Sequence, residues 1–315
     1  MEIHSSEVGL IPCPRYDRAL VKEGVAALCI SLGFTVPAGS KVLLKPNLVS
    51  GRRKDGLACT QAEFVAGTAE WFLDLGARVT VGDSPAFGTA KGVMSSCGIA
   101  AALGKYPVTL TDFDEPVAVT VPGGLSLKIA RPALECDFLI NLPRVKAHGQ
   151  LLITLAVKNY FGTVIGFRKA ALHARLGGRE GRFEAMLVDL LEVLPGGISL
   201  IDGVIAMHQQ GPVNGKPFPL GIIGGALNPV ALDTALLQVL GIDPEQSPLW
   251  RECRRRNLPG SRQETLYFPL GLPGAFPVSR FQVPGRLKPV SFHPLHLFIS
   301  AMKRVRERCR PKLSR

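Results

Sequence analysis

The chain has 315 residues, of which 46% are hydrophobic and 20% charged, and its formal net charge is +12. This composition is typical of a globular protein and excludes a disordered or fibrous chain. No run of about 18 uninterrupted apolar residues occurs, and no basic stretch followed by an apolar one opens the sequence, so we expect neither a spanning helix nor a signal peptide.

Strand and helix signals alternate from the N-terminus. Asp17 is placed to cap a helix that runs through Leu32. Residues 41–44 form a short apolar run that predicts a buried strand. We predict a second helix after this strand, because Thr60 and Glu63 have the spacing of a capping box.

The alternation continues to about residue 245. A strand is predicted at 78–81, and residues 117–121 and 125–129 flank a Pro-Gly-Gly turn that predicts a hairpin. Further helices are predicted at 182–194 and after Asn228, a capping residue followed by proline. Strands that alternate with helices predict an α/β fold, with a mainly parallel sheet flanked by helices, in one body or two lobes.

Residues 137–163 hold the densest polar cluster of the chain. The apolar run 138–140 predicts a strand that leads into this cluster, and a helix is predicted at 151–161. The polar residues of the segment are Asn141, Arg144, Lys146, His148, Lys158 and Asn159. Three cations, two amides and an imidazole around a strand-to-helix transition favour binding of a small anion. We therefore predict that the two amides, Arg144 and Lys158 bind the anionic substrate.

Lys146 and His148 alternate along an extended segment and therefore share one face of it. A neighbouring ammonium lowers the pKa of an imidazole, which favours a neutral general base at pH 7. We predict that these two residues are catalytic; a purely structural histidine is the alternative. If the helix face that carries Lys158 is buried, its charge needs either an internal acid or a bound anion.

Other polar residues directly follow three of the predicted strands. Lys45 and Asn47 follow one strand, Asp83 the next, and Asp202 a strand near residue 200. Open α/β sheets bind ligands beyond the carboxyl ends of their strands, so we expect these residues to converge. We assign Lys45 and Asn47 to anion binding, and Asp83 and Asp202 to a divalent cation. Surface turns are the alternative, and Asp202 and Asp233 could instead pair with the lysines.

The cysteines give no sign of a metal or cluster site. No two of the seven lie closer than 16 residues, and no C-x-x-C pair occurs. We therefore expect reduced, mostly buried thiols and no iron–sulfur cluster. Phosphate-loop, dinucleotide-binding and nucleophile-elbow motifs are also missing, so the sequence offers no specific nucleophile.

Several motifs in fixed order resemble the family known as domain of unknown function 362. They are KPNLV (45–49), GDSP (82–85), INLPRVKAHG (140–149), TLAVKNYFG (154–162), IDGVIAM (201–207), GP (211–212) and NPVALD (228–233). The resemblance spans about residues 8–242 and implies a cytosolic bacterial or archaeal protein related to iron–sulfur and redox proteins. Many relatives carry a ferredoxin-like cluster domain whose cysteine spacing this chain lacks. His208 stands where the resemblance implies an acid.

The C-terminal residues hold all of the excess positive charge. Residues 1–245 contain 22 basic and 22 acidic residues, whereas residues 280–315 contain ten and one. We therefore separate an α/β body, residues 1–245, from a Pro- and Arg-rich basic extension, residues 246–315. Within the extension, residues 293–312 join an apolar half to a basic half. An anionic membrane surface, nucleic acid and a packed terminal helix are the alternatives for this segment.

The sequence thus favours an enzyme that binds a small anionic substrate or cofactor at the strand ends and uses acid–base or metal-assisted chemistry. One alternative is a binding or adaptor protein that uses its basic tail. The other is a redox protein related to the iron–sulfur members of the family. We place the protein in the cytoplasm, either free or at the surface of a membrane.

Overall fold

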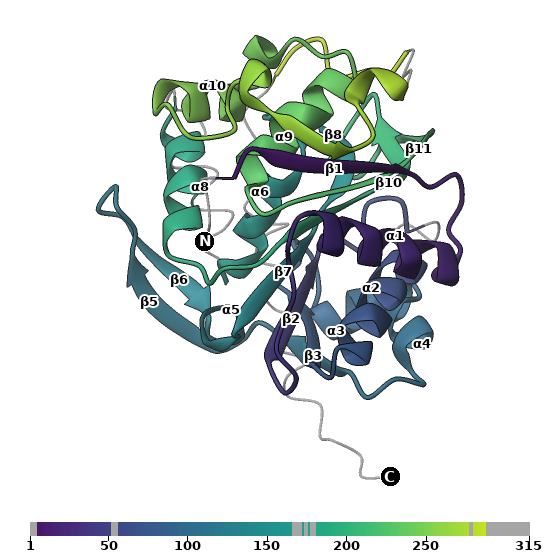
Figure 1. Cartoon of the computed structure of the whole chain (residues 1–315). Coiled ribbons are helices and arrows are strands. Elements are labelled where there is room, and N and C mark those ends of the chain that lie inside the picture. The colour runs from purple at the N-terminus through teal and green to yellow at the C-terminus, as the bar shows by residue number, and fades with distance from the viewer. Residues whose placement is uncertain are drawn as a thin grey trace.

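A ten-stranded sheet forms the centre of the molecule (Figure 1). Eight strands follow the order β12-β1-β11-β10-β7-β2-β3-β4, while β8 pairs with β10 and β9 with β8. The structure, a computed structural model, describes residues 5–51, 56–165, 172, 176, 181–276 and 280–287.

The strands of this sheet are β1 (Glu7–Pro12), β2 (Lys41–Pro46), β3 (Arg78–Asp83), β4 (Thr109–Asp112), β7 (Phe138–Leu142), β8 (Arg144–His148), β9 (Leu152–Thr154), β10 (Ser199–His208), β11 (Lys216–Ala226) and β12 (Tyr267–Leu270). The main helices are α1 (Arg18–Ser31), α2 (Ala62–Asp74), α3 (Ala90–Ser96), α4 (Ile99–Leu103), α5 (Arg131–Glu135), α6 (Ala156–Asn159), α8 (Arg182–Glu192), α9 (Pro229–Val239) and α10 (Pro248–Arg255). A separate hairpin is formed by β5 (Pro116–Thr120) and β6 (Ser126–Ala130), and it projects away from the sheet in Figure 1.

The central strands of the sheet run parallel, as the sequence predicts. β4, β3, β2, β7 and β10 run parallel to one another, and β11 is antiparallel to both β10 and β1. Lys45 of β2 is in register with Asn141 of β7, which is in register with Ser199 of β10. The carboxyl ends of β2 and β7 therefore meet at one edge of the sheet, next to the first residues of the longer strand β10.

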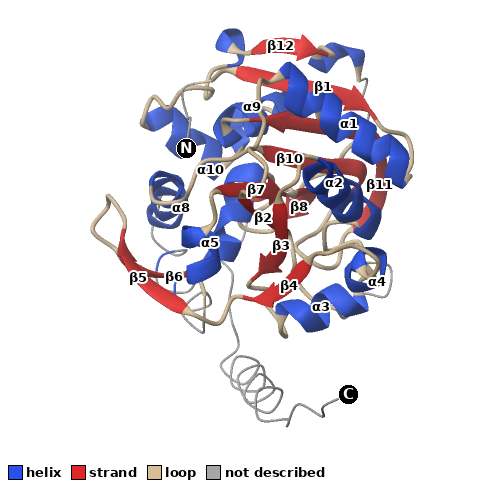
Figure 2. Cartoon of the chain, turned by 60° about the horizontal axis from the view of Figure 1, so that its bottom comes forward, coloured by secondary structure: helices blue, strands red, loops and turns tan. Residues whose placement is uncertain are grey.

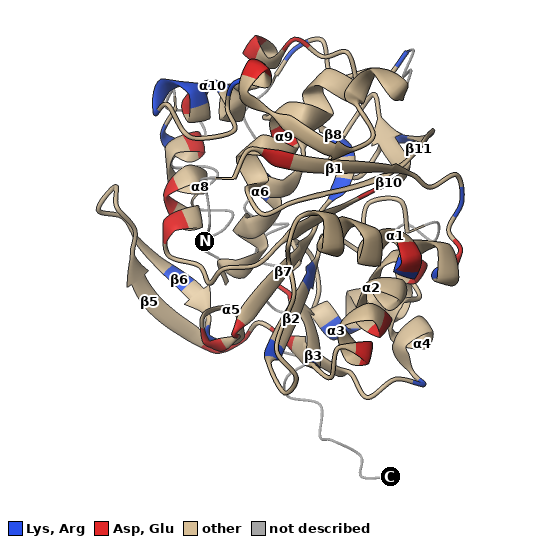
Figure 3. Cartoon of the chain, in the orientation of Figure 1, with Lys and Arg blue, Asp and Glu red and all other residues tan. Residues whose placement is uncertain are grey.

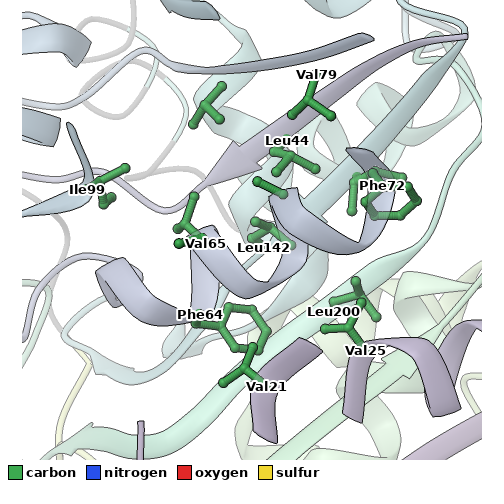
Figure 4. Close-up of a cluster of buried hydrophobic side chains, with 14 of the residues drawn as sticks. Val21, Val25, Leu44, Phe64, Val65, Phe72, Val79, Ile99, Leu142 and Leu200 are labelled. Atoms are coloured by element: carbon green, nitrogen blue, oxygen red, sulfur yellow. The ribbon is translucent and has the colours of Figure 1, made fainter. Parts of the chain in front are cut away.

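Helices cover both faces of the sheet (Figure 2). Leu44 lies in the core under α1 and α2, together with Phe64 and Phe72 (Figure 4), whereas its neighbour Leu43 lies in the core on the other face. The alternation follows from the two-residue period of a strand. Each fully buried side chain of this kind contributes about 1.5–3 kcal/mol to folding.

Local signals placed the capped helices correctly. Asp17 caps α1 by accepting a hydrogen bond from Leu20 N–H, and Asn228 caps α9. The capping box at Thr60 is wrong, because the side chain of Gln61 caps α2. The Thr60 hydroxyl instead donates to the Leu142 carbonyl, 2.7 Å away, and accepts from Asn47 N–H. Thr60 therefore ties the start of α2 to the strand ends.

The helix predicted at 151–161 is wrong over its first half. Residues 152–154 form β9, which pairs with β8 so that Lys146 stands opposite Thr154. Only α6 and the 3-10 helix η1 (Tyr160–Thr163) follow. Because all five residues of β8 are buried, pairing with β9 satisfies backbone groups that water could not reach. The apolar pattern of residues 151–161 therefore serves a buried hairpin and a short helix.

Part of the predicted C-terminal extension belongs to the sheet and its helical cover. β12 pairs in parallel with β1 at the edge, and α10 packs against α8. Arg256, just after the basic end of α10 (Figure 3), bonds Asp189 of α8 at 2.6 Å. Residues 293–312 lie outside the described residues. Within the described part of the chain, no helix has the length and apolar character needed to cross a membrane.

Candidate functional site

Buried polar side chains gather at the carboxyl ends of β3, β2 and β7, beside β10, β8 and α6. They include Lys45, Asn47, Asp83, Asn141, Arg144, Lys146, His148, Asn159 and Asp202, and all except Asn47 are less than one-tenth exposed. The fold therefore brings nine of the ten predicted site residues into one buried region. Lys158 is half-buried on α6 beside it. The prediction that Asp202 follows a strand is wrong, because β10 continues past it to His208 in its pairing with β11. Hydrogen bonds divide the region into two clusters.

Lys45 and Asp83 form the innermost ion pair. The Lys45 ammonium lies 2.9 Å from one carboxylate oxygen of Asp83, and the other oxygen accepts from Leu48 N–H. Burial lowers the pKa of Lys45, and the facing carboxylate opposes that shift. Gly162 packs directly against the pair, since a Cβ atom there would lie 2.1 Å from Asp83 Oδ1. Lys45 thus has an internal counter-charge.

Lys146 is a second buried lysine, with a different kind of partner. Its ammonium donates to the side-chain oxygen of Asn47 and, at 2.9 Å, to the carbonyl of Ala58. Among the described residues, no carboxylate lies within 4 Å of this ammonium. Burial is the main reason why the pKa of Lys146 falls to about 7. This lysine is therefore poised to exchange a proton near neutral pH.

A chain of side-chain hydrogen bonds leads away from Lys146, with every donor pointing the same way. The Asn47 amide donates to Asn159 at 2.7 Å, Asn159 donates to Asn141 at 2.8 Å, and Asn141 donates to the Ser199 hydroxyl at 3.1 Å. Such a chain is cooperative, because each bond polarises the next. The three amides are thereby held in fixed orientations at the strand ends.

The second cluster surrounds Arg144. Its guanidinium donates to the Cys59 carbonyl at 2.6 Å and twice to the Ile205 carbonyl, where the shorter bond is 2.6 Å. The same guanidinium lies 3.9 Å from the Asp202 carboxylate. Asp202 accepts from the Tyr16 hydroxyl at 2.6 Å and from Gln61 N–H at 2.9 Å. Burial, followed by Asp202, raises the pKa of Tyr16 well above its usual value. Arg144 thus fixes the turn that precedes α2.

His148 is held as a neutral imidazole. Its Nδ1 atom accepts hydrogen bonds from the N–H groups of Gln150 and Leu151, so the ring proton is on Nε2. Burial is the first reason why its pKa lies well below the usual value, followed by Lys158 and then Lys146. The predicted like-charge effect is therefore present but secondary. In this tautomer His148 offers one donor, Nε2–H.

Lys158 and Asp233 flank the site without pairing with each other. The Lys158 ammonium lies over the ring of Phe161, 4.3 Å from its centroid, and also near Phe183. Asp233 accepts from Ala156 N–H at 2.7 Å and from Val157 N–H at 3.2 Å, at the start of α6. Burial raises the pKa of Asp233 to about 8 against the effect of these bonds.

The two aspartates assigned to a cation lie in separate clusters. Asp83 faces Lys45, and Asp202 faces Tyr16 and Arg144. Among the residues that the structure describes, no group of three or more His, Cys, Asp or Glu side chains gathers as a metal site would require. Each carboxylate therefore serves protein donors in this arrangement.

Several residues that complete the site were missed or misassigned from the sequence. Thr60 was assigned to a capping box, but its hydroxyl instead bridges the ends of β2 and β7. Tyr16 and Ser199 carried no local signal, because their partners Asp202 and Asn141 are far along the chain. His208, where the resemblance implies an acid, packs against Phe218 with ring centroids 5.2 Å apart.

Comparison of the sequence with known proteins shows which family the chain belongs to. A family model described as "Domain of unknown function (DUF362)" matches residues 42–238. Over 262 residues the chain is 34% identical to the thylakoid-associated protein sll1697 of Synechocystis sp., with 83% of this chain and 81% of that protein covered. The chain belongs to the DUF362 family. The matched segment contains every predicted site residue, from Lys45 to Asp202.

Solved structures similar to this DUF362 chain are more distant. The lactate racemase apoprotein of Thermoanaerobacterium thermosaccharolyticum is 12% identical with a TM-score of 0.47, and 76% of this chain is covered. A protein from Thermotoga maritima is 13% identical with a TM-score of 0.43, and 66% of this chain is covered. The match spans 58% and 55% of those two chains.

Proposed function

We propose that this DUF362 chain is an enzyme that acts on a small carboxylate- or phosphate-bearing substrate, with Lys146 as its proton-transfer residue. The observation that carries the proposal is the setting of Lys146. It is buried at the carboxyl edge of the sheet, its ammonium bonds only neutral oxygens among the described residues, and its pKa is about 7. Lysines with strongly lowered pKa values are concentrated at functional sites.

The surroundings of Lys146 support acid–base chemistry. A lysine whose pKa equals the ambient pH is half ammonium and half amine, so it can both donate and accept a proton. An anionic group of the substrate would replace the oxygens of Asn47 and Ala58 as partners of the ammonium. Asn141 and Asn159 would orient polar groups of the substrate, and the Nε2–H group of His148 would donate a further hydrogen bond.

In this proposal the other two buried cations, Lys45 and Arg144, support the site and do not transfer the proton. Lys45 is neutralised by Asp83, and Arg144 holds the turn whose Ala58 carbonyl accepts from Lys146. Metal-assisted chemistry through Asp83 and Asp202 is the less favoured form, because both carboxylates already accept hydrogen bonds from protein groups. We therefore assign the proton transfer to the lysine.

Lys146→Met tests the proposal, because methionine keeps the chain length and removes the ammonium. We expect wild-type protein to gain thermal stability in the presence of inorganic phosphate or small carboxylates, and the variant to lose this gain. Lys91→Met is the matched control, since Lys91 is exposed on α3. Circular dichroism checks that both variants fold. The proposal fails if Lys146→Met keeps the anion-dependent gain, or if no anion stabilises the wild type.

A second candidate is attachment to an anionic membrane surface from the cytoplasmic side. Two observations favour it: the relative from Synechocystis is described as thylakoid-associated, and residues 280–315 hold ten basic residues against one acidic. Basic segments near a membrane gain about 1 kcal/mol per Lys or Arg from anionic lipids. The two candidates use different parts of the chain and are compatible with each other.

A further inference from the structure

One buried hydroxyl next to the strand of Lys146 has no hydrogen-bond partner among the described residues. It belongs to Thr154 of β9, a residue that is 3% exposed. Buried hydroxyl groups of folded proteins are nearly always hydrogen-bonded, because leaving one unpaired in the interior lowers stability. Asp83 Oδ1, another buried atom of the site without a hydrogen bond, differs because it faces the Lys45 ammonium at 2.9 Å. The Thr154 hydroxyl therefore calls for a separate explanation.

Strand pairing places Thr154 on the same face of the β8–β9 hairpin as Lys146. The two residues stand directly opposite each other in an antiparallel pair, an arrangement in which Cβ atoms are about 4.5–5.5 Å apart. His148 is two residues from Lys146 on β8 and shares this face. Ile153 stands opposite Ala147 on the other face and belongs to the apolar core. Thr154 is therefore a neighbour of the lysine to which proton transfer is assigned.

Thr154 does not cap the helix that follows it. A threonine close before a helix often accepts a hydrogen bond from one of the first backbone N–H groups, and α6 begins at Ala156. Here the carboxylate of Asp233, from α9, accepts from Ala156 N–H at 2.7 Å and from Val157 N–H at 3.2 Å. Because another helix supplies the cap of α6, the Thr154 hydroxyl is left for a different partner.

The surroundings of Lys146 suit an anionic group with more than one oxygen. The ammonium donates to two neutral oxygens, those of Asn47 and Ala58. Asn47 is partly exposed, so this end of the lysine lies close to the molecular surface. A carboxylate or phosphate has at least two oxygens, so one can accept from the ammonium while another accepts from a neighbouring hydroxyl. An ammonium and a hydroxyl on adjacent strands thus match the class of substrate proposed above.

We propose that Thr154 is a substrate-binding residue whose hydroxyl donates a hydrogen bond to the anionic group held by the Lys146 ammonium. This inference rests on the proposed function and adds to it a second donor, which fixes the anion relative to the lysine. The hydroxyl is unpaired within the described chain and becomes paired when the substrate binds. Binding therefore gains a hydrogen bond from this residue without breaking one inside the protein.

Thr154→Val tests the proposal, because valine keeps the shape of threonine and replaces the hydroxyl with a methyl group. In urea unfolding without added anions, we expect the variant to be at least as stable as wild type, since it removes an unpaired buried hydroxyl. Inorganic phosphate and acetate are then titrated separately, and the rise in Tm gives an apparent Kd. We expect the apparent Kd of the binding anion to increase about tenfold or more. Thr154→Ser retains the hydroxyl and should stay within about threefold of wild type.

Thr68→Val in the middle of α2 is the matched control. Thr68 is also buried, but its hydroxyl donates to the Phe64 carbonyl at 2.8 Å. Because this substitution removes a hydrogen bond that exists within the protein, we expect it to lower stability without anions and to leave the apparent Kd unchanged.

Two results for Thr154→Val would overturn the proposal. Lower stability than wild type without anions, or failure to fold, would mean that the hydroxyl is paired inside the protein. An unchanged apparent Kd would mean that the bound anion does not meet the hydroxyl. If Lys146→Met loses the response to anions while Thr154→Val keeps it, the role of Thr154 is wrong and the proposed function stands. If neither anion stabilises the wild type, the proposed function fails and the role of Thr154 fails with it.

Discussion

Lys45 and Lys146 show how the surroundings give one residue type two roles. Both are fully buried, but Lys45 has a carboxylate at 2.9 Å, whereas Lys146 bonds an amide oxygen and a carbonyl. Lowering the pKa of Lys146 from 10.5 to about 7 corresponds to a cost of about 5 kcal/mol for holding the charged form, at 1.36 kcal/mol per pKa unit. This cost is in line with the proposed role of Lys146, since functional sites retain residues that lower stability.

The titration of Lys146 predicts a specific pH dependence of stability. Between pH 7 and 10.5 the unfolded chain binds a proton at this lysine and the folded chain does not, so stability rises with pH. Lys146→Met removes this contribution. Chemical unfolding between pH 7 and 10 should show the wild type gaining about 1.4 kcal/mol per pH unit relative to the variant.

Other groups titrate in both proteins, so only the difference between the two curves reports on Lys146. The two hydrogen bonds that the variant loses add an offset that does not change with pH. Parallel stability curves for the two proteins over this range would mean that Lys146 keeps an ordinary pKa. The assignment of proton transfer to this residue would then lose its basis.

Short elements position the site more than long ones do. α6 and η1 together span only residues 156–163, yet they supply Asn159 to the amide chain and Gly162 to the wall of the Lys45–Asp83 pair. The N–H groups that begin α6 are satisfied by Asp233 of α9. Tertiary contacts, rather than helix propensity, therefore hold this segment in place.

Gly162→Ala should break the buried ion pair. An added Cβ atom would lie 2.1 Å from Asp83 Oδ1 and 2.3 Å from Lys45 Nζ, so the two charges must separate. Because separating a buried pair leaves charges uncompensated, we expect a loss of about 3 kcal/mol or more in urea unfolding. Gly196→Ala is the control, since a Cβ atom there meets nothing within 4 Å, and it should change stability by about 0.5 kcal/mol or less. Equal effects of the two substitutions would contradict this account.

Charge is unevenly distributed over the molecule: acidic and basic residues balance in the body, and the C-terminal end is strongly basic. The body buries most of the predicted site residues at one edge of the sheet, while the excess positive charge lies in residues 246–315. The body itself extends beyond residue 245, because α10 and β12 complete its core and its sheet. Residues 280–315 are therefore the segment on which a membrane or nucleic-acid role would rest.

Removing residues 288–315 tests the membrane candidate while leaving every continuous described element intact. In a flotation experiment we expect the full chain to rise with vesicles that contain phosphatidylserine, because the anionic lipids attract its basic residues. The shortened chain should not rise with these vesicles. Raising the salt concentration should release the full chain, since screening weakens this attraction. Vesicles of neutral phosphatidylcholine are the control. Binding of both chains, or of neither, would exclude the tail as the attachment site.

Local patterns in the chain were sufficient for the parallel sheet and the caps of α1 and α9. These features depend on neighbours within a few positions, so spacing and residue type predict them. The polar residues were expected to follow strands, but Lys45, Asn141 and Asp202 lie inside β2, β7 and β10. The partners of those polar residues could not be found from local patterns. Asn47 meets Lys146 across 99 positions, and Tyr16 meets Asp202 across 186. Such contacts depend on strand register and helix packing, which short-range preferences do not encode. For the same reason, only the folded chain shows that Lys45 faces the carboxylate of Asp83, whereas Lys146 faces only neutral oxygens among the described residues.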